Sequence, residues 1–177
     1  MKKIILKSTA VLALTIIFIT GSAQKAYMKA EGSITGIIKD MGVGKFSDKM
    51  ELTGYSFEGI QPRDQATGAA SGKSPKMSLS VTKNFGQSSV QFLNATFKNE
   101  VLKTVVIEVY KTNNQGQEFL EETITLSDVN VSSFKQTFDE TPPPGTFKGP
   151  SDQITFFFRK INITNATSKA SAEDSWH

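Results

Sequence analysis

Alternating apolar and polar residues predict β-strands over most of the chain from Ala26 onward. The clearest example is the segment 76–85, where Met77, Leu79 and Val81 share one face and polar residues occupy the other. Strands that are closely spaced around a single helix predict a mainly β fold, a closed or nearly closed antiparallel barrel. The other segments with this pattern are 27–31, 49–57, 101–111, 118–126, 129–138 and 153–163.

The segment 89–98 has a helical period instead of a strand period. Val90, Leu93 and Phe97 are spaced at i, i+3 and i+7, which predicts an apolar stripe that packs against the barrel. The sequence S-x-x-Q at 88–91 matches a capping box at the start of a helix. We therefore expect one short α-helix beside the strands.

The strand over 49–57 changes its apolar parity partway along. Met50 and Leu52 share one face, whereas Tyr55 and Phe57 share the other. Gly54 lies between the two pairs and can adopt a positive φ, so we expect a β-bulge there. If the bulge needs that conformation, Gly54→Val should destabilise the fold by about 1 kcal/mol or more.

The last predicted strand is apolar on both faces, so both faces need to be covered. Its first row of apolar residues is Ile154, Phe156 and Phe158. The opposite row is Phe157, Ile161 and Ile163. Two interpretations of the second row remain open, namely packing under the protein's own helix and packing against another subunit.

Residues 1–23 have the three parts of a secretory signal peptide. Three lysines precede an uncharged apolar run at 10–20, and Gly21-Ser22-Ala23 supplies small residues for cleavage. Cleavage after Ala23 would make Gln24 the first mature residue. The alternative is an uncleaved membrane anchor, but the run is shorter than the roughly 20 residues of a membrane span. We expect export through Sec to the periplasm or beyond, with no stable membrane anchor.

The rest of the chain divides into a barrel domain over 24–163 and a tail. The tail, 164–177, has few apolar residues and is predicted to be flexible. Within the barrel, the segment 62–75 has no apolar period and is rich in Gly, Ser and Ala, which predicts a long exposed loop.

Removal of the signal peptide also changes the charge of the protein. The whole chain has 20 Lys and Arg against 17 Asp and Glu, and three of the lysines lie in the signal peptide. The mature chain is therefore formally neutral. A neutral protein has no net attraction to nucleic acid or acidic lipid, so we expect neither as a partner.

The sequence offers little catalytic or metal-binding chemistry. It contains no Cys and one His, the terminal His177, which predicts no thiol catalysis, no catalytic triad and no His or Cys metal site. Asp139, Glu140 and Asp152 flank a proline-rich loop, but without EF-hand spacing they indicate solvated charges rather than a calcium site. The adjacent residues 121–122 are both Glu and should point to opposite faces of a strand. We predict no enzyme activity, cofactor or metal.

The order of these features resembles the Hcp (haemolysin-coregulated protein) family of type VI secretion. A-Y-M-K-A-E-G at 26–32 is similar to the family's opening strand, and Y-S-F at 55–57 stands where the family often has W-S-W. The stretch 119–133, which ends in D-V-N-V-S-S, and the last strand at 152–161 also resemble family segments. The likeness extends over nearly all of 26–163.

This resemblance implies a β-barrel with one flanking helix and no catalysis. It implies homohexameric rings that stack into a tube, with secreted effectors or other proteins as further partners. The long loop would engage the next ring, which points to Arg63, Asp64, Gln65 and Lys73 as stacking residues. Phe157, Ile161 and Ile163 would belong to the interface between subunits.

Two features of the chain depart from the family pattern. Tube proteins act from the cytoplasm without a Sec signal, and Pro142-Pro143-Pro144 replaces the family's usual glycine-rich connection. A second functional class therefore stays open, a secreted monomeric barrel that binds glycans or proteins. An aromatic platform on exposed loops would favour that class, and the loops offer only Phe46, Phe147 and Trp176.

Overall fold

The computed structural model describes residues 24–42, 44–60, 63–69, 76–138 and 149–175. The predicted signal peptide and the triple proline lie outside the described residues. Within the described ranges, no helix is long and apolar enough to cross a membrane. The helical elements are α1 (Gln87–Phe97) and the 3-10 turn η1 (Gly44–Phe46). The strands are β1 (Gln24–Gly32), β2 (Gly36–Ile38), β3 (Met50–Leu52), β4 (Gly54–Ile60), β5 (Lys76–Asn84), β6 (Val101–Thr112), β7 (Glu118–Thr137), β8 (Ser151–Asn165) and β9 (Ser171–Ser175).

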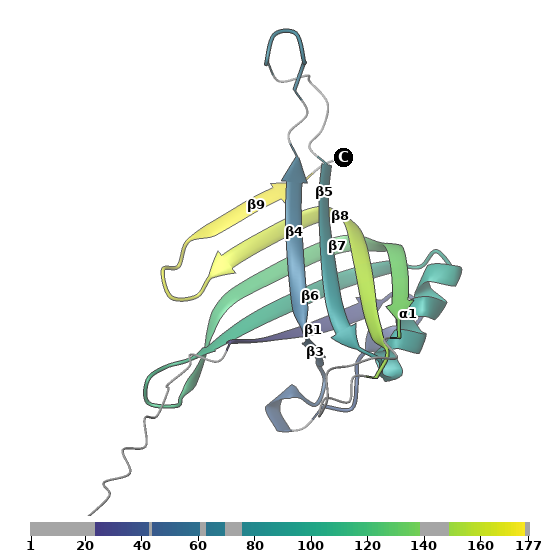
Figure 1. Ribbon diagram of the computed structural model, residues 1–177, viewed down its shortest axis with the longest axis vertical. Coiled ribbons are helices and arrows are strands. Elements are labelled where there is room, and N and C mark those ends of the chain that lie inside the picture. Colours follow the sequence, from purple (N-terminus) through teal and green to yellow (C-terminus); the bar gives the residue numbers. More distant parts are fainter. Residues whose placement is uncertain (1–23, 43, 61–62, 70–75, 139–148, 176–177) are drawn as a thin grey trace, which may run out of the picture.

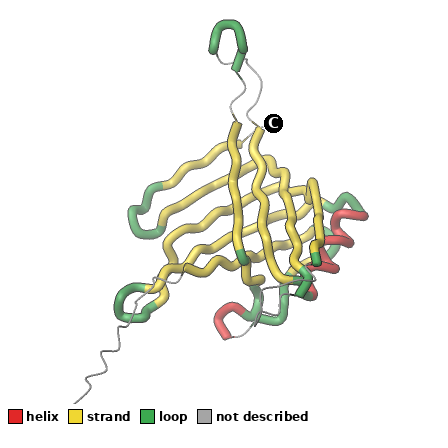
Figure 2. Tube along the Cα trace, in the orientation of Figure 1, coloured by secondary structure: helices red, strands yellow, loops and turns green. Residues whose placement is uncertain are grey.

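The strands form one antiparallel sheet that curves into a barrel (Figures 1 and 2). The order along the sheet is β2-β1-β6-β7-β8-β5-β4, and β9 pairs with β8. Since β3 pairs with β1 while β4 pairs with β5, the β3–β4 segment joins the two ends of the sheet. This arrangement confirms the prediction of a mainly β antiparallel fold with one short helix.

The barrel interior is filled by alternate residues of successive strands, as the period of two predicts. β5 contributes Leu79 and Val81, and β8 contributes Ile154, Phe156 and Phe158, all fully buried. Phe92 of α1 reaches the same core, with its ring centroid 5.9 Å from that of Phe156. The helix therefore closes part of the barrel instead of lying apart from it.

The parity change near Gly54 has a different cause from the predicted bulge. The chain stops pairing with β1 after Leu52 and begins pairing with β5 at Gly54, with Thr53 between the two strands. The Thr53 amide donates to the Thr82 carbonyl at 2.8 Å, which carries the chain from one partner strand to the other. Gly54 does not have a positive φ, and a Cβ built there meets no atom within 4 Å. The positive φ expected of Gly54 was therefore wrong.

A single 20-residue strand, β7, replaces two strands predicted over 118–138. It continues through Asp128, which has a φ of 52°. Around this residue the buried positions of β7 change parity, from Leu126 to Val129. The paired strand β8 changes parity at the same level, from Phe158 to Ile161. The two strands thus bend together around the core.

The helix α1 has the predicted position but a different orientation. Its buried residues are Ser88, Ser89, Phe92 and Ala95, whereas Val90 and Phe97 are exposed. The predicted inward stripe of Val90, Leu93 and Phe97 was wrong. The first helical residue is Gln87 and the N-cap is Gly86, so the predicted cap at Ser88 was also displaced.

The segment predicted as a flexible tail contains a strand in the structure. β9 pairs with β8 from Ser171, opposite Thr164, to Ser175, opposite Lys160. Asn165 forms the connecting turn, because its Oδ1 accepts the amides of Thr167 and Ser168. Backbone pairing to an open strand edge needs no apolar side chains, and for this reason composition did not reveal it.

Candidate assembly surfaces

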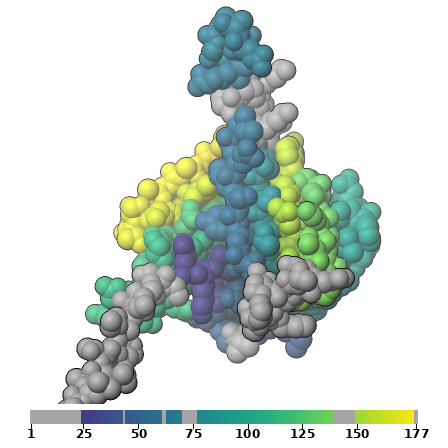
Figure 3. Space-filling view, in the orientation of Figure 1, coloured from purple at the N-terminus to yellow at the C-terminus, as the bar shows by residue number. Residues whose placement is uncertain are grey.

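The β4–β5 hairpin carries a turn that stands well away from the barrel (Figures 1 and 3). Its described residues, Arg63–Ala69, are all exposed. Asp64 organises the turn, because its Oδ1 accepts the amides of Ala66 and Thr67 at 3.0 and 2.8 Å. The Thr67 backbone amide is the main cause that lowers the pKa of the Asp64 carboxyl. The turn is therefore held by its own contacts and is exposed to solvent.

Three of the predicted stacking residues, Arg63, Asp64 and Gln65, lie on this turn. Arg63 Nη1 donates to the Gly68 carbonyl at 3.1 Å, and Gly68 has a φ of 68°. Lys73 lies outside the described residues. The structure thus brings the three together at the far end of the hairpin.

The predicted interface row on β8 does not form one surface. Phe157 is 51% exposed, whereas Ile161 is 4% exposed and belongs to the core. Ile163 is half-buried and packs against the same core. Because the parity of β8 changes between Phe158 and Ile161, only Phe157 keeps the outward position that the interface prediction requires.

The outward face of α1 carries the apolar side chains that were predicted to be buried. Val90 is 53% exposed and Phe97 is 76% exposed, with Leu93 half-buried between them. We call these three residues the α1 stripe. Apolar residues grouped on one exposed helix face are typical of an interaction surface. Nearby in the sequence, Val101 at the start of β6 is also exposed.

A buried polar cluster explains why α1 has this orientation. Lys83 Nζ lies 3.2 Å from Asp40 Oδ2, 3.8 Å from Asp152 Oδ2 and 3.2 Å from Ser89 Oγ. Ser89 also donates to Asp152, and the Ser88 amide donates to Asp40 Oδ1 at 2.8 Å. We call Lys83, Asp40, Ser88, Ser89 and Asp152 the Lys83 cluster. Because buried charges need partners, the cluster holds the serine side of α1 inward and turns the α1 stripe outward.

The Lys83 cluster has the residue types of a serine–lysine pair but not the access that catalysis requires. Lys83, Ser89 and Asp152 are each at most 1% exposed. Among the described residues, no group of three or more His, Cys, Asp or Glu is placed to hold a metal ion. Asp139 and Glu140 of the weighed calcium site lie outside the described residues. The cluster therefore positions α1. Lys83, Ser89 and Asp152 are closed to solvent, and Asp40 is the member that is partly exposed and lines a cavity at the surface.

A second polar contact lies close to the point where the chain passes from β3, paired with β1, to β4, paired with β5. The Tyr55 hydroxyl on β4 donates to Glu122 Oε2 on β7 at 2.7 Å. Burial, followed by the hydrogen bond to Glu122, raises the pKa of Tyr55 to about 12. This contact ties the projecting hairpin to the opposite wall of the barrel.

The sequence interpretation missed both polar contacts, although a pattern that marks them is present. Lys83 is in phase with Leu79 and Val81 on β5, and Asp152 is in phase with Ile154 on β8. An ionisable residue that continues a buried period of two indicates a buried, paired charge. Glu122 is in phase with the buried Ile124 and Leu126 of β7 and is itself half-buried and paired with Tyr55.

The sequence of this barrel is similar to that of known proteins. Residues 27–164 match the family model described as "Type VI secretion system effector, Hcp". The chain is 28% identical over 165 residues to the "Major exported protein" of Pseudomonas aeruginosa, covering 87% of this chain and 96% of that protein. The binding module considered above is not favoured by these matches.

Solved structures share the fold at lower sequence identity. A crystal structure of an Hcp protein has a TM-score of 0.80 at 22% identity, covering 88% of this chain and 99% of that chain. The secreted protein Hcp3 from Pseudomonas aeruginosa has a TM-score of 0.70 at 24% identity, with the same coverage of both chains. Because the family model spans most of the chain, the protein belongs to the Hcp family of type VI secretion.

Proposed function

We propose that this protein is an exported, non-catalytic structural protein that assembles into homo-oligomeric rings, with six subunits in each ring. The observation that carries the proposal is the match of the Hcp family model to 27–164, the whole barrel with its projecting hairpin. Secretion fits the same family and the exported relative. The expected absence of enzyme activity rests on the structural role of this family.

Exposed apolar residues support contact with further copies of the chain. The α1 stripe and Phe157 each present large side chains to solvent. Full burial of such a side chain stabilises an assembly by roughly 1.5–3 kcal/mol. A formally neutral mature chain also permits identical copies to approach one another closely.

The route of export distinguishes this chain from tube proteins that act from the cytoplasm. We infer that residues 1–23 direct the chain through Sec and are removed after Ala23. A chain threaded unfolded across the membrane folds only on the far side. Its rings would therefore form in the periplasm or outside the cell, where secreted effectors or other proteins would be their partners.

Sedimentation of the mature protein at micromolar concentrations tests ring formation. We expect the wild type to sediment as a ring and Phe157→Asp to sediment as a smaller species with an unchanged circular dichroism spectrum. Phe119→Asp is the matched control, because Phe119 is also an exposed phenylalanine but lies elsewhere on the barrel, on β7. A wild-type protein that remains monomeric would contradict the proposal and favour the second functional class, the secreted binding module.

A further inference from the structure

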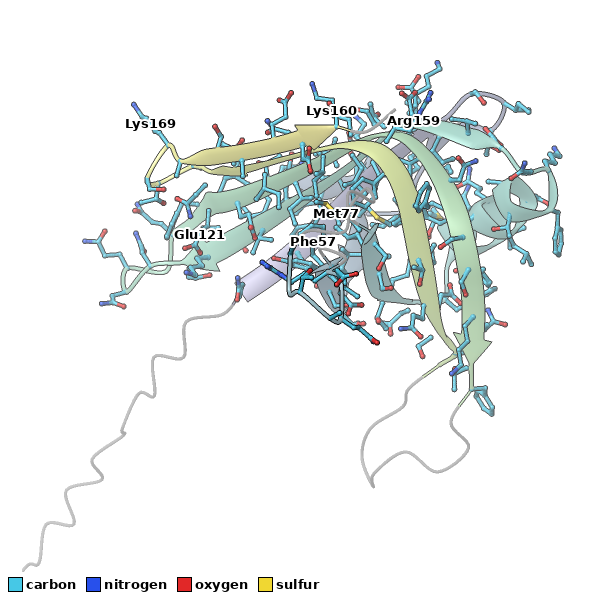
Figure 4. The ribbon with its side chains drawn as sticks, turned by 90° about the horizontal axis from the view of Figure 1, so that it is seen from above. Phe57, Met77, Glu121, Arg159, Lys160 and Lys169 are labelled. Atoms are coloured by element: carbon cyan, nitrogen blue, oxygen red, sulfur yellow. The ribbon has the colours of Figure 1, made fainter. Side chains whose placement is uncertain are left out.

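The first described residue of β1 lies beside two carboxylates. Gln24, Glu121 and Glu122 line one cavity of about 220 Å³, together with Val109, Lys111 and Asn165. Gln24 pairs with Lys111 on β6, which brings the start of β1 to the end of the sheet where β7 begins. Figure 4 shows Glu121 at this end of the sheet.

The two glutamates line the same cavity because β7 is irregular there. Val109 pairs with Glu122 and Tyr110 pairs with Leu120, so Glu121 has no partner in the ladder. Adjacent residues on a regular strand point to opposite faces, and the extra residue of a bulge removes that constraint. The prediction that Glu121 and Glu122 would be separated by the strand was therefore wrong.

The ionisable groups that line this cavity carry more negative than positive charge. Lys111 Nζ lies 2.5 Å from both carboxylate oxygens of Glu121, but only Oε1 accepts a hydrogen bond from it. The other oxygen, Oε2, is buried and accepts no hydrogen bond from a described group. Glu122 accepts a hydrogen bond from the neutral hydroxyl of Tyr55. One lysine thus faces two carboxylates, which leaves a net charge of −1 among these groups.

We propose that cleavage after Ala23 creates an α-ammonium group on Gln24 that binds between Glu121 and Glu122. The inference rests on the proposed processing site, since in the precursor the Gln24 nitrogen is a neutral amide. Cleavage converts it into a cation with three donors at a cavity that has a net negative charge. One carboxylate oxygen there, Glu121 Oε2, is ion-paired with Lys111 but accepts no hydrogen bond from a described group. The mature chain would then gain a stabilising contact at the start of β1 that the precursor lacks.

The pairing makes a specific prediction for the pKa of the α-amine. Free α-amino groups have pKa values of about 7.7–8.0, and an opposite charge in contact favours the charged form. The titratable groups around the amine are Lys111 of β6, Glu121 and Glu122 of β7, and Tyr55 of β4. We expect the pKa to rise by about one unit, a tenfold change in proton affinity. Because the folded pKa is raised, this stabilisation is complete below pH of about 8 and is lost as the pH rises through the raised pKa.

Two measurements on exported protein from the native host test the proposal. Intact mass spectrometry identifies the first residue, and the pH dependence of α-amine acylation gives its pKa. We expect a chain that starts at an uncyclised Gln24 with a raised pKa. Glu122→Gln should return the pKa to its usual range, whereas Tyr55→Phe should keep it raised because the carboxylate remains. Glu121→Gln provides a second variant if Glu122→Gln does not fold.

The two measurements distinguish a wrong cleavage position from an absent ammonium site. A chain that begins at another residue would overturn both. A chain that begins at Gln24 with an ordinary α-amine pKa, unchanged by Glu122→Gln, would overturn the ammonium site alone. Loss of ammonia from Gln24, which would leave a neutral cyclised terminus, would also overturn the site while leaving the cleavage position intact.

Discussion

At the scale of single residues, buried and half-buried ionisable groups define the barrel together with its apolar core. Lys83, Asp152 and Glu122 all continue the buried period of two on their strands. Each has a partner from a distant part of the chain, such as Asp40 for Lys83 and Tyr55 for Glu122. Burial of a charge is tolerated only with such partners, so these contacts specify which segments must meet.

Removal of one partner from the Lys83 cluster should be strongly destabilising. Asp152→Ala leaves the buried Lys83 ammonium without one of its two carboxylates and takes an acceptor from Ser89 and Gln136. We expect a loss of about 3–5 kcal/mol in the free energy of unfolding, measured by urea titration. The control is Asp174→Ala on the exposed strand β9, where the change should stay within about 0.5 kcal/mol. Equal effects of the two substitutions would show that the cluster does not hold the fold.

At the scale of elements, α1 shows how a tertiary contact overrides an amphipathic pattern. Its sequence has an apolar stripe at helical spacing, yet the structure buries the neighbouring face with Ser88, Phe92 and Ala95. Two serines on this face have charged partners in the barrel, Asp40 and Asp152, whose burial would otherwise be costly. An apolar stripe that the monomer does not use is then available to a second copy.

Truncation of phenylalanines on the two faces of α1 distinguishes the two orientations. Phe92→Ala should cost about 3–5 kcal/mol of stability, because Phe92 is fully buried against Phe156. Phe97→Ala should change the stability of the monomer by no more than about 0.5 kcal/mol, because the side chain is exposed. Urea unfolding under conditions that keep both variants monomeric measures the difference. The reverse order of effects would support the orientation predicted from the apolar stripe.

At the scale of the whole molecule, the barrel has a projecting hairpin at one end and α1 at its side (Figure 1). The β3–β4 segment changes partner at Thr53, which both closes the barrel and directs β4 toward the hairpin tip. The turn Arg63–Ala69 therefore reaches beyond the surface that a ring of barrels would present. Under the proposed function, ring formation and ring stacking would therefore use different parts of the chain.

Charge reversal on the hairpin tip should affect stacking without affecting ring formation. We expect Arg63→Glu combined with Gln65→Glu to shorten stacks seen by electron microscopy, while sedimentation still detects single rings. Lys169→Glu is the control, because Lys169 is also exposed but lies in the turn between β8 and β9 (Figure 4). Stacks of unchanged length in the tip variant would remove the proposed role of Arg63 and Gln65.

Local patterning predicted most of the strands and the presence of one short helix. It did so because a period of two or of 3.6 places apolar residues on one face whatever their partners are. Met77, Leu79 and Val81 are an example, since their shared face in the sequence packs on or within the core of the structure. Family resemblance in the sequence supplied the architecture in which these elements are joined.

Only the tertiary structure decided which faces are used and where a strand changes partner. The orientation of α1 depends on Asp40 and Asp152, and the core position of Ile161 depends on a bend at Asp128 that β7 and β8 share. The strand β9 depends on the open edge of β8. Each of these outcomes is set by a contact between segments far apart in the sequence, and such a contact leaves no period in either segment alone.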